Sequence, residues 1–388
     1  MRRVWSAGLA GSVCAVLALG VASPAAATTG EGAADRPVKL GNVQRAIEAL
    51  AKNAGVVGAI GEVYVDGKRV GHGSAGSRLL DGKGGRIPSN ARYRIGSQTK
   101  VMTATVALQL VKEGKLGLDD KLSDVLPETA QQDLVDRADE ITVRQLIQHT
   151  SGIPDFIASG KFDVYDFTTK YSLADLVKAS RSVPRRGEVG EYLYSTTNYV
   201  LLSMIIERVT GHSRATEFAR RLFIPLGMDD TYLATKIGDG IKGPHGHGYV
   251  PGSKGKPRDV DRLNPTSWGA EGAISTAHDI SAFHRAFTQG KLLPANLQGV
   301  ISGRPAPSAQ QQAQQQAQRQ RPPVLCGGKP ELRPVAGSVP GAYTVTFTSP
   351  DGRLQFAVST TLKIPNHDAM AAVGPDINKA AEAVFCRS

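Results

Sequence analysis

The chain has 388 residues, of which 41% are hydrophobic and 21% charged. This composition supports a sizeable core and excludes global disorder, and the length fits one large domain or two ordinary ones. Lys and Arg total 46 against 35 Asp and Glu, a net charge of +11. The basic residues are scattered, and neither an RNA-binding aromatic motif nor zinc-finger spacing is present, which argues against a nucleic-acid partner. Three cysteines without a CxxC pair exclude a disulfide-rich miniprotein and the usual structural zinc sites.

Residues 1–27 have the pattern of a secretory signal peptide. Arg2 and Arg3 precede an uncharged apolar stretch over 7–21, and small residues at 25–27 predict cleavage after Ala27. The apolar stretch is too short to span a bilayer comfortably. The pattern therefore predicts a secreted protein without a stable membrane anchor, possible association with the cell wall, and a mature net charge of +9 once Arg2 and Arg3 are removed.

The mature chain would keep two cysteines, Cys326 and Cys386. In an oxidising compartment a disulfide is favoured over two thiols. Such a bond would close a loop of about sixty residues and contribute about 4 kcal/mol on the chain-entropy model.

The N-terminal part of the mature chain predicts a short helix followed by a β-hairpin. Residues 28–37 are small and polar and predict a flexible N-terminus, whereas 43–51 has apolar residues at helical spacing. Strand patterns over 57–65 and 68–74 are joined by Asp66-Gly67, a strong hairpin signal.

The middle of the chain, 101–269, predicts a mainly helical subdomain. The expected helices are 101–112, 143–148, 173–179, 199–209 and 215–222.

Near the C-terminus a second hairpin is predicted from 343–349 and 354–362, followed by a helix over 376–385. Strands at both ends of the chain predict an α/β fold in which one antiparallel sheet is assembled from both termini and flanked by helices. We expect 38–388 to form one domain, interrupted by a flexible Gln-rich insertion at 305–323 that has too few apolar residues to fold.

Two short motifs suggest ligands but lack the necessary context. Gly71-x-Gly73-x-x-Gly76 matches a dinucleotide fingerprint but leads into a Gly- and Pro-rich loop rather than a helix, so a turn is favoured and no cofactor is expected. His245-Gly246-His247 offers two metal ligands, yet the sequence shows no third ligand at a supporting distance. Loop histidines are the preferred interpretation, and no metal site is predicted.

The pattern Ser-x-x-Lys occurs twice. The copy at 253–256 lies in a Gly/Lys/Pro loop, whereas Ser97-Gln98-Thr99-Lys100 follows a strand-like segment and opens an apolar helix. Residues i and i+3 share a helix face, so the Lys100 amine can lie beside the Ser97 hydroxyl. Burial would lower the Lys100 pKa toward neutrality and let the amine accept a proton, which is how a serine becomes a nucleophile. The alternative is an N-cap serine followed by a surface lysine.

Five segments together resemble the serine β-lactamase/penicillin-binding superfamily. The likeness is greatest to its class C β-lactamase and actinomycete D-alanyl-D-alanine carboxypeptidase branch. The segments occur in the family's order and are YRIGSQTK at 93–100, LIQHTSGI at 146–153, YLYSTTNY at 192–199, FIPLGMDDT at 223–231 and GAISTAHDI at 272–280.

The resemblance implies a role for several residues. Ser97 would be the acylated nucleophile, Lys100 its proton acceptor, and Tyr194 the residue that relays the proton to the leaving amine. The oxyanion would be held by the backbone N–H groups of Ser97 and of Ser338, which follows Gly337. Such donors stabilise charge that exists only in the transition state.

Other positions differ from the family pattern or are less specific. Thr196 stands where the second motif has asparagine, and Val335-Ala336-Gly337 replaces the Lys- or His-Thr-Gly triplet whose basic residue binds the substrate carboxylate. Arg333, about 6.6 Å further along the same strand face, is a candidate substitute. Trp268 either lines the acyl pocket or covers the core as a loop aromatic.

Two functions follow from these observations. The first is a secreted serine hydrolase of carboxypeptidase or esterase type, expected to be a monomer that acts on cell-wall peptide, a related amide or ester, and β-lactams. The second is a catalytically weak or inactive relative that binds cell-wall peptide or a partner protein, which the altered third motif favours. A binder of anionic polymers is a third possibility that rests on net charge alone.

Overall fold

The structure is a computed structural model that describes residues 40–185, 187–252, 256–269, 272–303, 331–365 and 368–386. The described residues belong to one compact unit. The predicted signal peptide, the stretch 28–37 that was predicted to be flexible, the predicted Gln-rich insertion at 305–323 and Cys326 lie outside the described residues. The disulfide between Cys326 and Cys386 therefore stays a prediction.

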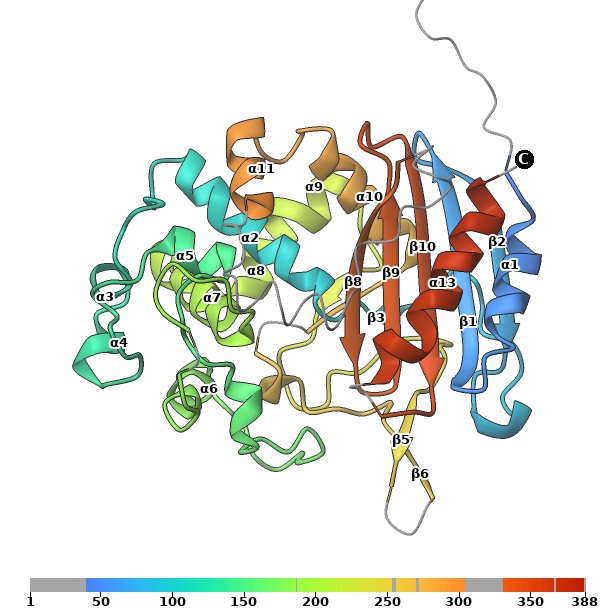
Figure 1. Ribbon diagram of the computed structural model, residues 1–388, viewed down its shortest axis with the longest axis horizontal. Coiled ribbons are helices and arrows are strands. Elements are labelled where there is room, and N and C mark those ends of the chain that lie inside the picture. The colour runs from blue at the N-terminus through green and yellow to red at the C-terminus, as the bar shows by residue number, and fades with distance from the viewer. Residues whose placement is uncertain are drawn as a thin grey trace, which may run out of the picture. The chain divides into compact units, whose positions relative to one another are not determined.

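A five-stranded antiparallel sheet is built from both ends of the chain, in the order β2-β1-β10-β9-β8 (Figure 1). Its strands are β1 (Val56–Val65), β2 (Lys68–Gly76), β8 (Arg333–Val339), β9 (Ala342–Thr348) and β10 (Leu354–Leu362). Asp66 and Gly67 both have positive φ, as a tight two-residue hairpin turn requires. The pairing of β1 with β10 confirms the prediction of one sheet from two termini.

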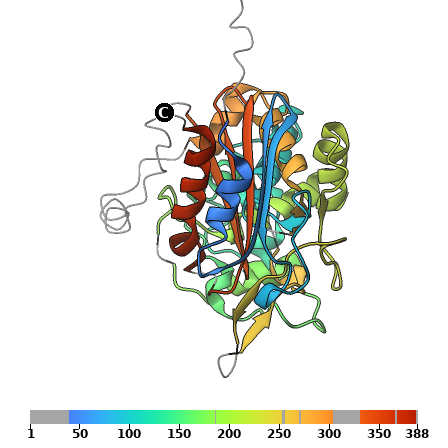
Figure 2. The same cartoon turned by 90° about the vertical axis from the view of Figure 1, so that its right-hand side faces the viewer.

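Two helices cover one face of this sheet, α1 (Val43–Leu50) and α13 (Ala369–Phe385) (Figure 2). Side chains from both helices and the sheet, such as Ile47, Phe356 and Ile377, are fully buried in a shared hydrophobic cluster. The sequence analysis predicted the last helix over 376–385, whereas the structure begins α13 at Ala369 and places Pro375 inside it.

The helical region packs against the opposite face through α10 (Ala277–Thr288), which contacts β1, β9 and β10. The other helices are α2 (Gln98–Lys112), α3 (Leu122–Val125), α4 (Glu128–Gln131), α5 (Val143–Gln148), α6 (Leu173–Ser180), α7 (Thr196–Thr210), α8 (Arg214–Phe218), α9 (Ile224–Leu226) and α11 (Ala295–Ser302), with short helical turns at Leu80–Gly82, Phe156–Ser159, Ala219–Phe223 and Pro265–Ser267.

Short strands also lie in this part of the chain. A three-stranded sheet joins β3 (Tyr93–Arg94), β7 (Ala273–Ser275) and β4 (Tyr232–Leu233), and a separate hairpin joins β5 (Tyr249–Pro251) to β6 (Pro257–Asp259). No helix among the described residues is both long and apolar enough to cross a membrane.

Helix α2 runs through the core, and eleven of its fifteen residues are buried. Gln98, at its first turn, is fully buried and fixes the helix to the sheet and to α10. Its amide nitrogen donates to Thr344 Oγ1 at 3.0 Å, and its amide oxygen accepts from Thr346 Oγ1 at 2.9 Å. His284 Nε2 lies 3.2 Å from the same oxygen, and burial lowers the His284 pKa to about 4, so the ring is neutral at pH 7. The start of α2 is therefore held in place by neutral, satisfied hydrogen bonds.

Candidate active site

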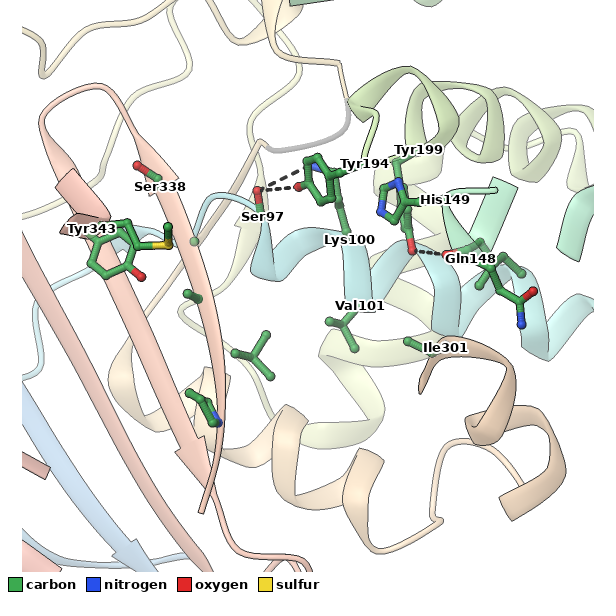
Figure 3. Close-up of a pocket in the computed structure, with 16 residues that line it drawn as sticks. Ser97, Lys100, Val101, Gln148, His149, Tyr194, Tyr199, Ile301, Ser338 and Tyr343 are labelled. Carbon is green, nitrogen blue, oxygen red and sulfur yellow. Dashed lines mark hydrogen bonds between the residues drawn. The ribbon is translucent and has the colours of Figure 1, made fainter. Parts of the chain in front are cut away.

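Ser97 immediately precedes α2, and its hydroxyl does not cap that helix. Its Oγ lies 3.4 Å from Lys100 Nζ and 3.1 Å from the Tyr194 hydroxyl (Figure 3). The predicted contact between Ser97 and Lys100 is thus present. The alternative of an N-cap serine with a surface lysine is wrong, because Lys100 is only 5% exposed.

The environment of Lys100 favours an uncharged amine. Desolvation lowers its pKa to about 7, and the Asp155 carboxylate, which acts in the opposite direction, does not offset this. The amine lies 5.1 Å from the centre of the Tyr194 ring and 6.0 Å from that of Tyr199. Near neutral pH a substantial fraction of the amine has a lone pair that can accept the Ser97 proton.

Tyr194 lies just before α7 and reaches Ser97 from the side opposite to the sheet (Figure 3). Tyr194 is 44% exposed, so the phenol faces the opening of the site. It donates a hydrogen bond to the Ser97 hydroxyl. A phenol in this position can pass a proton between Ser97 and a leaving group.

Strand β8 packs against the backbone of residues 95–97 with no room for a side chain at the closest points. A Cβ added to Gly337 would lie 1.9 Å from the carbonyl oxygen of Ile95 and 3.0 Å from the backbone nitrogen of Ser97. A Cβ added to Gly96, which has φ +53°, would lie 2.8 Å from the backbone nitrogen of Ser338. These two glycines thus let the backbone around Ser338 approach the backbone around Ser97 closely.

A cavity of about 550 Å³ opens above these residues. The described residues that line it are Ser97, Lys100, Val101, Ile147, Gln148, His149, Tyr194, Tyr199, Ile301, Pro334, Val335, Ala336, Gly337, Ser338, Tyr343 and Met370. Apart from His149, Lys100 is the only basic side chain among them. The wall that Val335 and Ala336 contribute is uncharged.

Three predicted substrate contacts are not placed in the cavity wall. Arg333 is exposed, pairs with Glu331 at 2.9 Å and is not among the residues that line the cavity. Thr196 is 1% exposed, and its backbone nitrogen donates to Asp155. Trp268 follows the helical turn Pro265–Ser267 and is also outside the lining residues, which favours its alternative as a loop aromatic.

The two sequence motifs that suggested ligands have different outcomes. Gly71, Gly73 and Gly76 lie in β2 rather than in a turn or before a helix, so they form no dinucleotide-binding site. His245 and His247 do have a third potential ligand, Asp261, with the ligand atoms within 4.8 Å of one another. The sequence analysis missed Asp261 because it lies sixteen residues after His245, and only the β5–β6 hairpin brings the two residues together.

Each histidine of this cluster is already paired with a carboxylate. His245 Nε2 lies 2.7 Å from Asp261 Oδ1, and His247 Nδ1 lies 2.9 Å from Asp259 Oδ2. The Asp261 carboxylate raises the His245 pKa against the opposing effect of burial. Two histidine–carboxylate pairs account for these contacts, and we assign no function to the cluster.

The arrangement of Ser97, Lys100 and Tyr194 on this fold is that of a serine hydrolase. The sequence matches the Beta-lactamase family over residues 43–374, and the chain therefore belongs to that family, within the serine β-lactamase/penicillin-binding superfamily. Penicillin-binding protein 4 from Amycolatopsis lactamdurans is 31% identical over 271 residues, which cover 69% of this chain and 69% of that protein. Penicillin-binding protein 4* from Bacillus subtilis is 30% identical over 37% of this chain, but the match spans only 31% of that protein.

Solved structures agree with this assignment. A D-stereospecific amidohydrolase from Streptomyces sp. superposes with a TM-score of 0.72 at 27% identity, covering 89% of this chain and 98% of that one. The D-amino acid amidase from Ochrobactrum anthropi SV3 superposes with a TM-score of 0.70, covering 88% and 98%, but at 22% identity it supports the fold alone. The predicted fold class is confirmed.

The close approach of β8 predicts the effect of one added methyl group. Gly337→Ala would force Cβ against the Ile95 carbonyl and push Ser338 away from Ser97, so we expect acylation of Ser97 to slow by at least about tenfold, a fraction of what loss of an oxyanion donor costs. The measurement is the labelling rate with a fluorophosphonate probe. Gly299→Ala, where the added Cβ meets nothing within 4 Å, is the matched control. Equal rates in both variants would mean that β8 does not form the oxyanion hole.

Proposed function

We propose that the protein hydrolyses amide or ester bonds through an acyl-enzyme formed on Ser97. The observation that carries the proposal is the contact of one hydroxyl with both a buried amine of lowered pKa and a phenol. Nucleophilic serines require such a neighbouring base, and the cavity above Ser97 leaves room for a substrate.

The chemistry proceeds in two halves. Neutral Lys100 accepts the Ser97 proton as Oγ attacks the substrate carbonyl, and the N–H groups of Ser97 and Ser338 stabilise the oxyanion. Tyr194 passes the proton to the leaving amine or alkoxide, which departs as the tetrahedral intermediate collapses to the acyl-enzyme. A water molecule then attacks the acyl carbonyl, its proton is taken up by the Tyr194/Lys100 pair, and Ser97 is restored.

We further propose that the preferred substrates lack a free carboxylate next to the scissile bond. Val335 stands where a basic residue would bind that carboxylate, and Arg333 points to Glu331 instead. Burying a carboxylate against an uncharged wall is costly. The likeness to a D-stereospecific amidohydrolase supports D-amino acyl amides or esters as the substrate class.

A D-alanyl-D-alanine carboxypeptidase acting on cell-wall peptide remains the narrower candidate. The 31% identity to penicillin-binding protein 4 supports it, as does the signal-peptide pattern at 1–27, from which we propose that the protein acts outside the cytoplasm. A non-catalytic relative that binds such peptides is the second candidate, favoured by the uncharged Val335 wall.

A covalent adduct on Ser97 tests the proposal most directly. We expect a fluorophosphonate or a fluorescent penicillin to add its mass to the tryptic peptide that contains Ser97, and Ser97→Ala to abolish the adduct. Ser182→Ala, at an exposed serine just after α6, is a suitable control. Binding of cell-wall peptide without any adduct or turnover would support the non-catalytic relative instead.

Substrate preference can be tested with two compounds that differ in one group. We expect D-alanyl-D-alanine amide to be cleaved with at least about tenfold higher kcat/KM than D-alanyl-D-alanine, because leaving a buried group unpaired costs about 1–3 kcal/mol and more for a charged carboxylate, which Val335 cannot pair, than for a neutral amide. Val335→Lys should shift the ratio toward the free carboxylate. A higher kcat/KM for the free carboxylate in the unmodified protein would show that another group binds it.

The Lys100 pKa predicts the pH dependence of acylation. The active form has a neutral amine, so the labelling rate of Ser97 should rise as pH increases through about 7 and level off above it, with an approximately tenfold change per pH unit well below 7. Circular dichroism across the same range checks that the protein stays folded. A rate that is flat from pH 5 to pH 9 would exclude Lys100 as the proton acceptor.

A further inference from the structure

We propose that His149 is a positioning residue that holds the Tyr194 phenol over Ser97. This inference rests on the proposed hydrolase function and deepens it. His149 lies in one of the segments that show the family resemblance, but no role for it could be predicted, because its partners are more than forty residues away. It is 6% exposed and lines the cavity.

The backbone at His149 attaches the Tyr194 loop to the end of α5. His149 terminates that helix in the left-handed conformation, with φ 58° and ψ 39°, which is uncommon for a residue other than glycine. The turn directs two successive carbonyls at the loop. Leu193 N donates to His149 O at 2.7 Å, and Gly190 N donates to Thr150 O at 2.7 Å.

The imidazole makes a third attachment directly beside Tyr194. Its Nδ1 accepts a hydrogen bond from Ser195 N at 3.1 Å. Since the Ser195 N–H can only donate, Nδ1 must be unprotonated in this arrangement. Asn198 agrees with this assignment: its Oδ1 accepts from Ser151, which leaves the amide nitrogen 3.4 Å from the same ring atom.

The imidazole also supports the Tyr194 ring itself. The two rings stack with centroids 4.4 Å apart and an interplanar angle of 25°. Behind the imidazole, Tyr199 packs at 5.0 Å and donates its hydroxyl to Ile147 O at 3.0 Å. His149 is therefore fixed from one side and presents a flat surface to Tyr194 on the other.

This support has a chemical consequence because Tyr194 is otherwise half exposed. A phenol that relays a proton must stay within hydrogen-bond reach of both Ser97 and the leaving group, and a displacement of about 1 Å can cost on the order of 10²-fold in rate. Neither nitrogen of His149 need touch the substrate. His149 affects the reaction by holding the Tyr194 phenol in position.

Two substitutions test the hydrogen bond to Nδ1 and the stacking of the rings separately. His149→Phe keeps a flat ring against Tyr194 but removes the Nδ1 acceptor, and His149→Asn keeps a polar side chain but removes the ring. We expect each to lower kcat by about tenfold to 100-fold, with KM changed less than about threefold. His72→Phe, on the exposed edge strand β2, is the matched control. Thermal unfolding identifies a variant that merely fails to fold.

A double-mutant cycle with Tyr194→Phe provides the decisive readout. If His149 acts through Tyr194, His149→Phe should cause no further loss of kcat once the phenol has been removed. Full additivity of the two losses, or a kcat within about twofold of the unmodified protein for both His149 variants, would overturn the inference. The absence of any Ser97 adduct in the unmodified protein would instead refute the proposed function, which makes the two failures distinguishable.

Discussion

Burial of the Lys100 amine is the constraint on which the rest of the site depends. An ammonium group in water would hold its proton, whereas desolvation inside α2 brings the pKa to about 7 and creates a base. That burial requires a helix surrounded on most of its faces, and eleven of the fifteen residues of α2 are buried. Gln98 then fixes the first turn of this helix to β9 and α10, so the Ser97 hydroxyl stays at a set distance from the amine.

The sheet supplies the other half of the site. Its strand β8 passes the nucleophile so closely that glycine is required at both Gly96 and Gly337. In the proposed mechanism the helical region provides the base and the phenol, and the sheet provides the second backbone donor. The proposed chemistry therefore lies at the boundary between the two layers.

The sequence predicted those features that depend on local spacing. The contact of Ser97 with Lys100 follows from i, i+3 geometry on a helix, and both hairpins follow from their turn residues. The contacts of Arg333 and Thr196 could not be predicted, because Glu331 and Asp155 supply them from other parts of the fold. The role inferred for His149 also escaped sequence analysis, since a left-handed turn and three contacts to a distant loop define it.

The pairing of β1 with β10 also bears on when the protein becomes reactive. The strand at the start of the described chain finds its neighbour only near the end, in the register Val56 with Leu362. Contacts between such distant segments slow folding, because the intervening loop must close first. During synthesis, Ser97 would emerge long before β8 and its backbone donor. The site around Ser97 would therefore be completed only after the last strands of the sheet had been made and paired.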